Sequence, residues 1–335
     1  MSKRVMVVGG TGNMSTAIVR LLVERGYDVS IYCRGKSALP PHPEARVVIG
    51  DRTEREVYIE TMRQGKFDYA IDMICATLQD AQDDYAAFPE VGRLVFCSTA
   101  GTYGDLLASE MPIREHYSMS YPTWKYGLIK RQAEEFFLGK YLSEHYPVTV
   151  IRPSVTFGRM KQLVRQIGMD NVWIDRIRKG KPIVTGNPYI MRNFLHADDA
   201  AAAFVGALEQ PACVGQAYNM VGPKPYDWQT YHRTMMKIVG REVEMVEVPL
   251  ETMLANQSDT FKVSDLFLYS YRYNSHLSGD KIARDIPDFR VRVPLEQGLA
   301  QALDFIERQG LIPDSDRYPG EDAVIQAQLA TRNRG

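Results

Sequence analysis

The sequence predicts an α/β fold in which a doubly wound parallel sheet is followed by a smaller C-terminal lobe. Three observations support this. Short segments rich in Val and Ile alternate with helical segments through the first half of the 335-residue chain. A glycine-rich turn, GGTGNMS, joins the first strand to the first helix, and the alternation stops after Pro153, where Gly and Pro become frequent. Strands that alternate with helices form parallel sheets whose two faces the helices cover.

The expected elements follow from this alternation. Apolar strands are predicted at residues 4–10, 28–34, 45–51, 69–75, 93–99 and 148–154. Helices are predicted at residues 15–26, 54–65 and 122–144, and the last begins at a proline, which suits a first helical turn. Beyond Pro153 we expect the chain to return to the sheet near residues 192–196 and 215–222.

Two domains and a tail are expected. Residues 1–155 form the first domain, and the chain returns to it at about residues 192–221. Residues 156–191 and 222–312 form the second lobe, where a substrate would be chosen. The polar tail at residues 313–335 is expected to pack on the surface or to be partly disordered.

Composition narrows the function. The 40 basic and 41 acidic residues nearly balance, which gives no electrostatic reason to expect nucleic acid or an anionic membrane as a partner. The first apolar run is too short for a signal peptide, and no run is long enough to span a bilayer. The four cysteines form no CxxC and no metal-ligand spacing. These features predict a cytoplasmic protein with buried thiols and no metal site.

The motif GGTGNMS lies between the first strand and the first helix, where dinucleotide-binding folds carry their glycine fingerprint. Gly9 and Gly12 let the backbone turn tightly and approach a pyrophosphate. The N-terminus of the helix that follows Asn13 and Met14 supplies unpaired N–H groups and positive potential. Ser15 stands at the third small position. The motif by itself also fits an ordinary turn, but its position predicts a Rossmann-type site for a nicotinamide dinucleotide.

The end of the second strand bears on the choice between NAD and NADP. Cys33 stands where a carboxylate would accept from the ribose 2′-hydroxyl of NAD, and Arg34 could pair with the 2′-phosphate of NADP. Stacking on adenine or simple solvation of Arg34 is the alternative. After the third strand, Asp51 is expected to accept from the adenine amine with Arg52 beside it, or else to cap the next helix.

The stretch SYPTWKYGLIK contains Tyr-x-x-x-Lys twice, as Tyr121 with Lys125 and as Tyr126 with Lys130. A residue before proline is disfavoured in a helix, so we expect Tyr121 outside the helix and Tyr126 one turn before Lys130 inside it. A phenol must lose about three pKa units, about 4 kcal/mol, to carry a proton near neutrality. Lys130 and a cationic cofactor could lower the pKa of Tyr126 by that amount. A helix-surface pair is the alternative.

Hydroxyl groups follow the fifth strand. Ser98 and Thr99 end the segment LVFCST at the expected carboxyl edge of the sheet, which is where ligands of such sheets bind. A hydroxyl there can orient a substrate alcohol toward Tyr126. Ordinary turn chemistry is the alternative.

Together these motifs resemble the extended short-chain dehydrogenase/reductase family, in its NAD-dependent epimerase/dehydratase group. The resemblance covers roughly residues 3 to 310 and rests on GGTGNMS, GDR, STAGTYG, YGLIK, IRPSVTFG, RNFLHADD and PLEQGLAQALDFI. It implies a catalytic triad of Thr99, Tyr126 and Lys130, in which the lysine also holds the nicotinamide ribose. It also implies cofactor contacts from Ser98 and Pro153.

Departures from the family pattern narrow the reaction. Dehydratases and decarboxylases of the family usually carry an acid one or two residues after the catalytic Ser or Thr, but here Ala100 and Gly101 follow. A 4,6-dehydratase is therefore not expected, and these small residues resemble UDP-galactose 4-epimerase-like enzymes. The CRGK stretch resembles a divergent branch that includes chloroplast stem-loop RNA-binding proteins.

Three functions remain open at this point. The first is a nucleotide-sugar epimerase that works through a transient ketone with tightly bound NAD. The second is an NADPH-dependent ketoreductase that acts on a sugar or another small carbonyl compound, which Arg34 favours. The third is a non-catalytic dinucleotide- or RNA-binding relative, against which the intact triad and the balanced net charge argue.

Basic residues of the second lobe are the candidates for substrate contact. Arg192, in RNFLHADD, matches an arginine that often contacts a nucleotide-sugar diphosphate in the family; a salt bridge to Asp198 or Asp199 is the alternative. Arg272 lies among tyrosines that could line the pocket, and the alternative is a stretch divided between core and surface. Arg159 belongs to a basic cluster interpreted first as a phosphate-facing rim and second as a solvated surface: Arg159, Lys161, Arg165, Arg176, Arg178, Lys179 and Lys181.

A homodimer is also expected, because the family commonly pairs through the helix that carries Tyr126 and the helix near residues 80–88. Phe136, Phe137 and Tyr85 are the candidates for its apolar patch.

Overall fold

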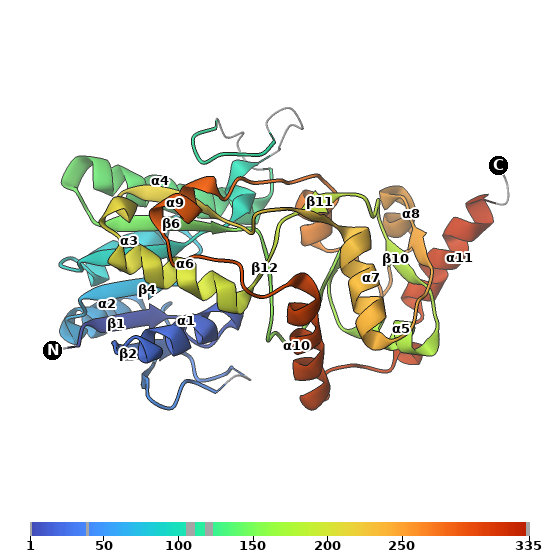
Figure 1. Ribbon diagram of the computed structural model, residues 1–335, viewed down its shortest axis with the longest axis horizontal. Helices are drawn as coiled ribbons and strands as arrows, with labels where there is room; N and C mark the ends of the chain where they lie inside the picture. The colour runs from blue at the N-terminus through green and yellow to red at the C-terminus, as the bar shows by residue number, and fades with distance from the viewer. Residues whose placement is uncertain (1, 38–39, 105–110, 118–122, 333–335) are drawn as a thin grey trace. The chain divides into compact units, whose positions relative to one another are not determined.

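The structure is a computed structural model that describes residues 2–37, 40–104, 111–117 and 123–332 (Figure 1). The chain divides into two compact units. Unit 1 consists of Met1–Thr156, Leu195–Pro223 and Leu277–Arg292, and unit 2 consists of Phe157–Phe194, Lys224–His276 and Val293–Gly335. Residues 277–292 thus belong to unit 1, although the sequence pattern placed them in the second lobe.

Unit 1 is built on a seven-stranded parallel sheet with the order β13-β6-β5-β4-β1-β2-β3. Its strands are β1 (Arg4–Val8), β2 (Asp28–Cys33), β3 (Arg46–Ile49), β4 (Tyr69–Asp72), β5 (Arg93–Cys97), β6 (Val148–Pro153) and β13 (Gln216–Met220). The order reverses direction at β1 and β4, which makes this sheet doubly wound. Ligands of such sheets bind at the carboxyl edge near that reversal.

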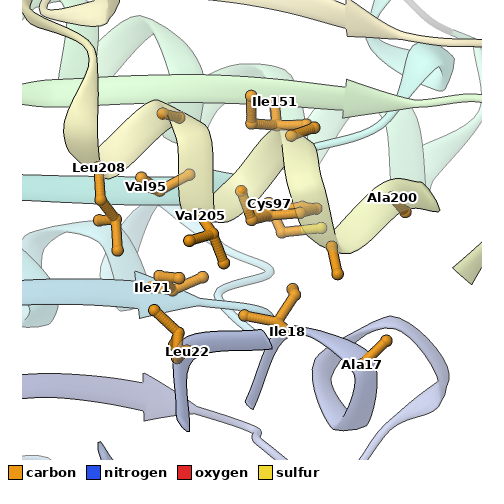
Figure 2. Packing of buried hydrophobic residues seen from close by; sticks show 14 of the residues in the cluster. Ala17, Ile18, Leu22, Ile71, Val95, Cys97, Ile151, Ala200, Val205 and Leu208 are labelled. Atoms are coloured by element: carbon orange, nitrogen blue, oxygen red, sulfur yellow. The ribbon is translucent and has the colours of Figure 1, made fainter. Parts of the chain in front are cut away.

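Helices cover both faces of this sheet (Figure 1). They are α1 (Asn13–Glu24), α2 (Arg55–Gly65), α3 (Leu78–Ala87), α4 (Lys125–Glu144), α6 (Ala197–Glu209) and α9 (Asp280–Asp285). Alternate strand residues face opposite sides, so Val5 and Val7 pack with α1 and α6, whereas Met6 and Val8 pack with α2, α3 and α4. Figure 2 shows the first cluster, in which Ile18 and Leu22 of α1 lie near Ile71 of β4.

Unit 2 combines helices with short strands of two or three residues. Its helices are α5 (Val172–Lys179), α7 (Trp228–Val239), α8 (Leu250–Ala255), α10 (Leu295–Arg308) and α11 (Gly320–Arg332), with a π-helical turn at Phe267–Tyr271. Its short strands pair as β8 (Val164–Arg165) with β9 (Gly168–Met169), β10 (Ile183–Thr185) with β15 (Met245–Glu247), and β11 (Met191–Arg192) with β14 (Tyr226–Asp227). The strands β7 (Val155–Phe157) and β12 (Phe194–His196) lie where the chain passes between the units.

Three expectations about the elements need correction. The segment 192–196 does not join the large sheet, because β11 and β12 form only two-stranded pairings. The helix α4 begins at Lys125 with Trp124 as its N-cap, three residues later than predicted, and residues 118–122, including Tyr121, lie outside the described residues. The tail beyond Pro313 folds within unit 2 and ends in α11. None of the described helices is long and apolar enough to cross a membrane.

Candidate functional site

The glycine loop joins β1 to α1 and is closed by a side chain. Gly9 has a φ of 81°, which L-residues rarely adopt, so glycine is required there. The hydroxyl of Ser15 accepts from the N–H of Gly12 at 2.7 Å and donates to the carbonyl of Gly9 at 2.7 Å. Ser15 therefore does more than replace a small glycine, because its hydroxyl holds the loop in its turn.

This loop fits a dinucleotide pyrophosphate. The first turn of α1 contains no acidic residue, so the positive end of the helix is not neutralised. The Oδ1 atom of Asn13 is buried and has no hydrogen-bond partner within the described residues. A buried acceptor without a donor is costly, and a hydroxyl group of a dinucleotide ribose could supply the donor that a pyrophosphate lacks.

The residues expected to contact the adenosine half lie at the same edge of the sheet. Arg34 follows β2 and is exposed to solvent. Asp51 follows β3, where its carboxylate accepts from the N–H and the hydroxyl of Thr53 at 3.0 and 2.8 Å. These bonds from Thr53 lower the pKa of Asp51, with smaller contributions from Arg34 and Lys36. Asp51 thus stabilises the turn before α2 and is ionised as an acceptor.

The guanidinium of Arg52 forms its hydrogen bonds with other residues of the protein. Its guanidinium is buried and donates to Asp72 at 2.6 Å, to Asp84 at 3.0 Å and to the carbonyl of Asp80 at 3.1 Å. Burial raises the pKa of Asp72, but Arg52 and other hydrogen bonds outweigh burial and hold it below its usual range. Burial and the charge of Asp72 raise the pKa of Asp84 well above its usual range. These contacts account for the Arg52 side chain without a cofactor.

Lys130 is held at the carboxyl edge of the sheet. It lies one turn after Tyr126 on α4, and its buried ammonium donates to the carbonyl of Cys75 at 2.5 Å and of Cys97 at 2.7 Å. These carbonyls follow β4 and end β5, the two strands nearest the middle of that edge. The loop with Cys75 is fixed in turn, because Asp72 accepts from the N–H groups of Ile74 and Cys75 at 2.6 Å each.

Tyr126 is partly exposed, with 39% of the residue accessible to solvent. Partial burial raises the pKa of Tyr126 above its ordinary value, and the nearby ammonium of Lys130 lowers it only in part. The protein alone therefore does not produce the low phenol pKa that the chemistry needs. A positive charge on a bound nicotinamide ring would act in the required direction.

Ser98 and Thr99 have different surroundings. Thr99 is half-buried and its Oγ1 accepts from the N–H of Gly101 at 3.2 Å, as expected of a turn residue. Ser98 is buried and donates a short hydrogen bond to Glu134. Pro153 ends β6 in register with Met220 of β13, at the same sheet edge.

Sequence reasoning missed the group that binds Ser98. Glu134 lies one turn after Lys130 on α4, and its buried carboxylate accepts a hydrogen bond of 2.7 Å from Nη2 of Arg152. Arg152 also donates to the phenol of Tyr103 at 3.0 Å. A glutamate on the predicted buried face of α4 was the available signal, because a buried carboxylate requires a partner. The network ties α4 to the strand end that carries Thr99.

Arg192 in unit 2 has no carboxylate partner within the described residues. Its guanidinium is buried and donates to the carbonyl and hydroxyl of Ser270 at 3.2 and 2.9 Å, and burial lowers its pKa to about 10. The alternative of a salt bridge to Asp198 or Asp199 is wrong. Asp198 pairs with Arg20 at 2.7 Å, and Asp199 accepts from the N–H of Arg292.

Unit 2 contains a cavity of about 520 Å³. Arg272 and Tyr273 form part of its wall, and the Arg272 guanidinium lies 4.7 Å from the centre of the Tyr273 ring. The Nε atom of Arg272 is buried without a hydrogen-bond partner within the described residues. Arg159, in contrast, is exposed and is not among the residues that line this cavity.

Most members of the basic cluster are paired within the protein, which leaves Arg159 and Lys161 as the members that the ion pairs do not explain. Five of its seven members pair with acidic residues, all but Asp170 and Asp175 from the last third of the chain: Arg165 with Asp170 and Glu321, Arg176 with Glu321 and Asp322, Arg178 with Glu307, Lys179 with Asp175, Asp314 and Asp316, and Lys181 with Asp316. The cluster therefore fastens the tail to unit 2.

The expected apolar patch for dimerisation also changes. Phe137 is fully buried in the core and cannot contribute to a surface. Phe136 and Tyr85 are half-buried and pack edge to face at 5.9 Å between α4 and α3. Among the apolar side chains of α4, Leu142 is the most exposed, at 78%.

Comparison with known proteins identifies relatives of the whole chain. The model of the NAD dependent epimerase/dehydratase family matches residues 5–221. A 2′-dehydrokanamycin reductase of Streptomyces kanamyceticus is 26% identical and the match covers 98% of this chain and 91% of the reductase. A chloroplast stem-loop binding protein of Arabidopsis thaliana is 22% identical, over 98% of this chain and 85% of that protein.

Solved structures with the same fold include several epimerases. An epimerase of Methanothermobacter thermautotrophicus has a TM-score of 0.75 at 18% identity and the match covers 93% of this chain and 94% of that one. A UDP-glucuronic acid 4-epimerase of Bacillus cereus, solved with UDP-glucuronic acid and NAD, has a TM-score of 0.73 at 16% identity, with coverages of 91% and 99%. At such identities the likeness establishes the fold.

Proposed function

The chain belongs to the NAD-dependent epimerase/dehydratase family, and on that premise we propose that it oxidises and reduces a carbinol carbon of a sugar, most specifically as a nucleotide-sugar epimerase. The observation that carries the proposal is the pair on α4. Tyr126 is partly exposed, and Lys130, one turn away, is anchored by two backbone carbonyls at the carboxyl edge of the sheet. A fixed ammonium near a partly exposed tyrosine is suited to proton transfer.

The residues would act as follows. A nicotinamide cofactor, when bound at the glycine loop, supplies the acceptor and donor of hydride. Tyr126 takes the proton from the substrate hydroxyl while hydride leaves the same carbon, so the carbinol becomes a ketone. The ammonium of Lys130 stabilises the phenolate, and the hydroxyl of Thr99 binds the substrate oxygen. In the return step the ketone, presented by its other face, receives hydride at carbon and the proton from Tyr126.

Two features of unit 2 support a nucleotide sugar as the substrate. Arg192 is a buried guanidinium whose charge is not balanced by a carboxylate within the described residues, and such a charge favours a nearby anionic group. The cavity of about 520 Å³ is large enough for the part of a substrate that does not react. A dimer through α3 and α4 remains part of the proposal.

An NADPH-dependent ketoreductase is the second candidate. Arg34 is exposed at the end of β2, where Cys33 stands at the position of the usual carboxylate, and its guanidinium could pair with a 2′-phosphate. The reductase relative from Streptomyces kanamyceticus matches along nearly the full chain. A binding-only function has less support, because the basic cluster that favoured anion binding is largely neutralised by acidic residues.

The test is mass spectrometry of the small molecules that denaturation releases from freshly purified protein. Retained NAD⁺ supports the epimerase, because its cofactor is recycled in place, and a co-released nucleotide sugar would identify the substrate class. An empty site that fills only with added NADPH supports the reductase. Protein that neither releases nor binds a nicotinamide dinucleotide would refute both enzymes.

A further inference from the structure

We propose that the C-terminal helix α11 forms part of the substrate site and that Gln328 helps to choose the base of the nucleotide. This inference rests on the proposed nucleotide-sugar function and deepens it. It starts from the anchoring of the tail. The carboxylate of Glu321 accepts from Arg165 at 3.0 and 2.7 Å and from the N–H of Val184 at 2.7 Å, and all three residues are buried.

A second set of contacts fixes the start of α11. Nη2 of Arg176 reaches Asp322 at 2.6 Å, and the hydroxyl of Thr260 accepts from the N–H of Gly320 at 3.0 Å. Buried, paired charges are costly to separate, so the first turn of α11 is held in one place and one rotation about its axis. Every later residue of the helix then has a defined direction.

Helical periodicity places Gln328 on the same face of α11 as Glu321. Residues three, four and seven positions after Glu321 share its face, and these are Val324, Ile325 and Gln328. Val324 and Ile325 are 0% and 5% exposed, and Gln328 is 8% exposed and lines the cavity of unit 2. The buried carboxylate of Glu321, the apolar side chains of Val324 and Ile325, and the cavity-lining Gln328 therefore share one face of α11.

The rest of the cavity wall indicates what it would hold. The rings of Phe267 and Tyr273 line it, together with Asn187 and the carboxylate-bearing Glu247. Aromatic rings and two amides suit a flat ring with a polar edge. Arg272 lines the same wall, so its guanidinium can donate to a carbonyl of a base while the carboxylate of Glu247 can accept from the N–H groups of a base. A wall that combines aromatic rings with both donors and acceptors suits the base of a nucleotide.

Gln328 adds a donor and an acceptor to this wall from a segment outside the matched family region, which ends at residue 221. An amide that can donate and accept distinguishes bases by the pattern of groups on their edges. Losing a hydrogen bond in a buried site leaves the partner group unsatisfied, which makes such contacts selective. Selection of the base would then depend on the tail.

The experiment is isothermal titration of the full-length protein with UDP, TDP, GDP and ADP, and separately with NADH and NADPH. The variants are Gln328→Ala, Gln328→Glu and, as a matched control, Gln326→Ala, which changes an exposed glutamine of the same helix. We expect Gln328→Ala to weaken binding of the preferred nucleotide about tenfold. The affinities of the four nucleotides should then differ less from one another than they do in the wild-type protein. We expect Gln328→Glu to change their ranking, and Gln326→Ala and dinucleotide binding to stay within about twofold of wild type.

The outcomes separate this inference from the proposed function. Unchanged nucleotide affinities in both Gln328 variants would overturn the inference and leave the nucleotide-sugar proposal standing. Wild-type protein that binds a dinucleotide but none of the four nucleotides would overturn the nucleotide-sugar proposal and this inference with it. An equal loss in Gln326→Ala, or lost dinucleotide binding in the Gln328 variants, would assign the effect to folding and also overturn the inference.

Discussion

The ammonium of Lys130 donates a hydrogen bond of 2.5 Å to the carbonyl of Cys75, and this contact ties α4 to the loop after β4. A second bond, of 2.7 Å, ties it to the end of β5 at Cys97. An ammonium has three N–H groups, so a third remains beyond these two bonds for a phenolate or a ribose. The position of the lysine is therefore set by backbone atoms of the sheet edge.

Tyr126→Phe should abolish turnover while leaving the fold and dinucleotide binding intact. Removal of a positioned proton carrier typically costs a factor of about 10² to 10⁴ in rate. The matched control is Tyr121→Phe, which removes the other tyrosine of the overlapping motif and should retain at least about half of the activity. Steady-state kinetics on the substrate that mass spectrometry identifies checks both variants. Equal losses in the two would contradict the assignment of Tyr126.

Asp72→Ala should make the position of the Lys130 ammonium less fixed, although Asp72 does not contact Lys130 directly. Asp72 holds the N–H groups of Ile74 and Cys75, so its loss frees the carbonyl that anchors the lysine. A less constrained ammonium stabilises the phenolate less, which raises the pKa of Tyr126 and moves the acidic limb of the oxidation rate, where the general base becomes protonated, to higher pH. Asp72→Asn keeps an acceptor and should recover part of the shift. A stability loss with an unchanged pH profile would show that the cluster is only structural.

Arg34→Ala should lower NADPH affinity about tenfold and change NADH affinity less than about twofold, because an exposed guanidinium pairs usefully only with the 2′-phosphate. Lys36→Ala, which removes another exposed cation two residues away, is the control. Fluorescence titration with each dinucleotide measures the effect. A protein that loses NADH affinity to the same extent would place Arg34 against the adenine instead.

Glu321→Ala should be among the most destabilising single changes. It leaves Arg165 and Arg176 buried without this carboxylate, and breaking a buried ion pair typically costs about 3–5 kcal/mol. Asp304→Ala breaks an exposed pair with Arg308 on α10 and should cost less than about 1 kcal/mol. Urea unfolding of both variants provides the comparison. Similar midpoints would mean that the tail contributes little to unit 2.

His232 should make the protein less stable in mild acid. Burial among aromatic rings, with a smaller contribution from Arg165, lowers the pKa of His232 to about 3. The unfolded chain binds this proton near pH 6.5 and the folded chain does not, so stability falls as the pH drops from about 6.5 toward 3.

Between pH 7 and 5 the contribution of His232 should fall by about 2 kcal/mol. His232→Gln should remove that part of the pH dependence, whereas His116→Gln, at an exposed histidine, should keep it. Thermal unfolding of the three proteins at several pH values measures the slopes. Parallel curves for His232→Gln and wild type would contradict a neutral, buried His232.

Local patterns in the sequence were sufficient for the architecture of unit 1. Apolar strands that alternate with helices, and glycines placed between them, depend on neighbouring residues only, and they predicted the parallel sheet and the glycine loop. The spacing of Tyr126 and Lys130 is likewise a property of one helix. For these features the short-range geometry of the backbone decides the outcome.

The partners of charged groups were decided by the tertiary structure alone. Nothing near Arg165 in the sequence indicates that Glu321, more than a hundred residues later, neutralises it, and the same holds for Arg52 with Asp84 and for Ser98 with Glu134. A charged side chain can be buried only where a group of opposite charge pairs with it, and that group can come from any distant part of the sequence. The sequence by itself therefore determined the sheet and the helix that carries Tyr126 and Lys130, whereas folding determined which distant polar residues pair with one another and stabilise the protein.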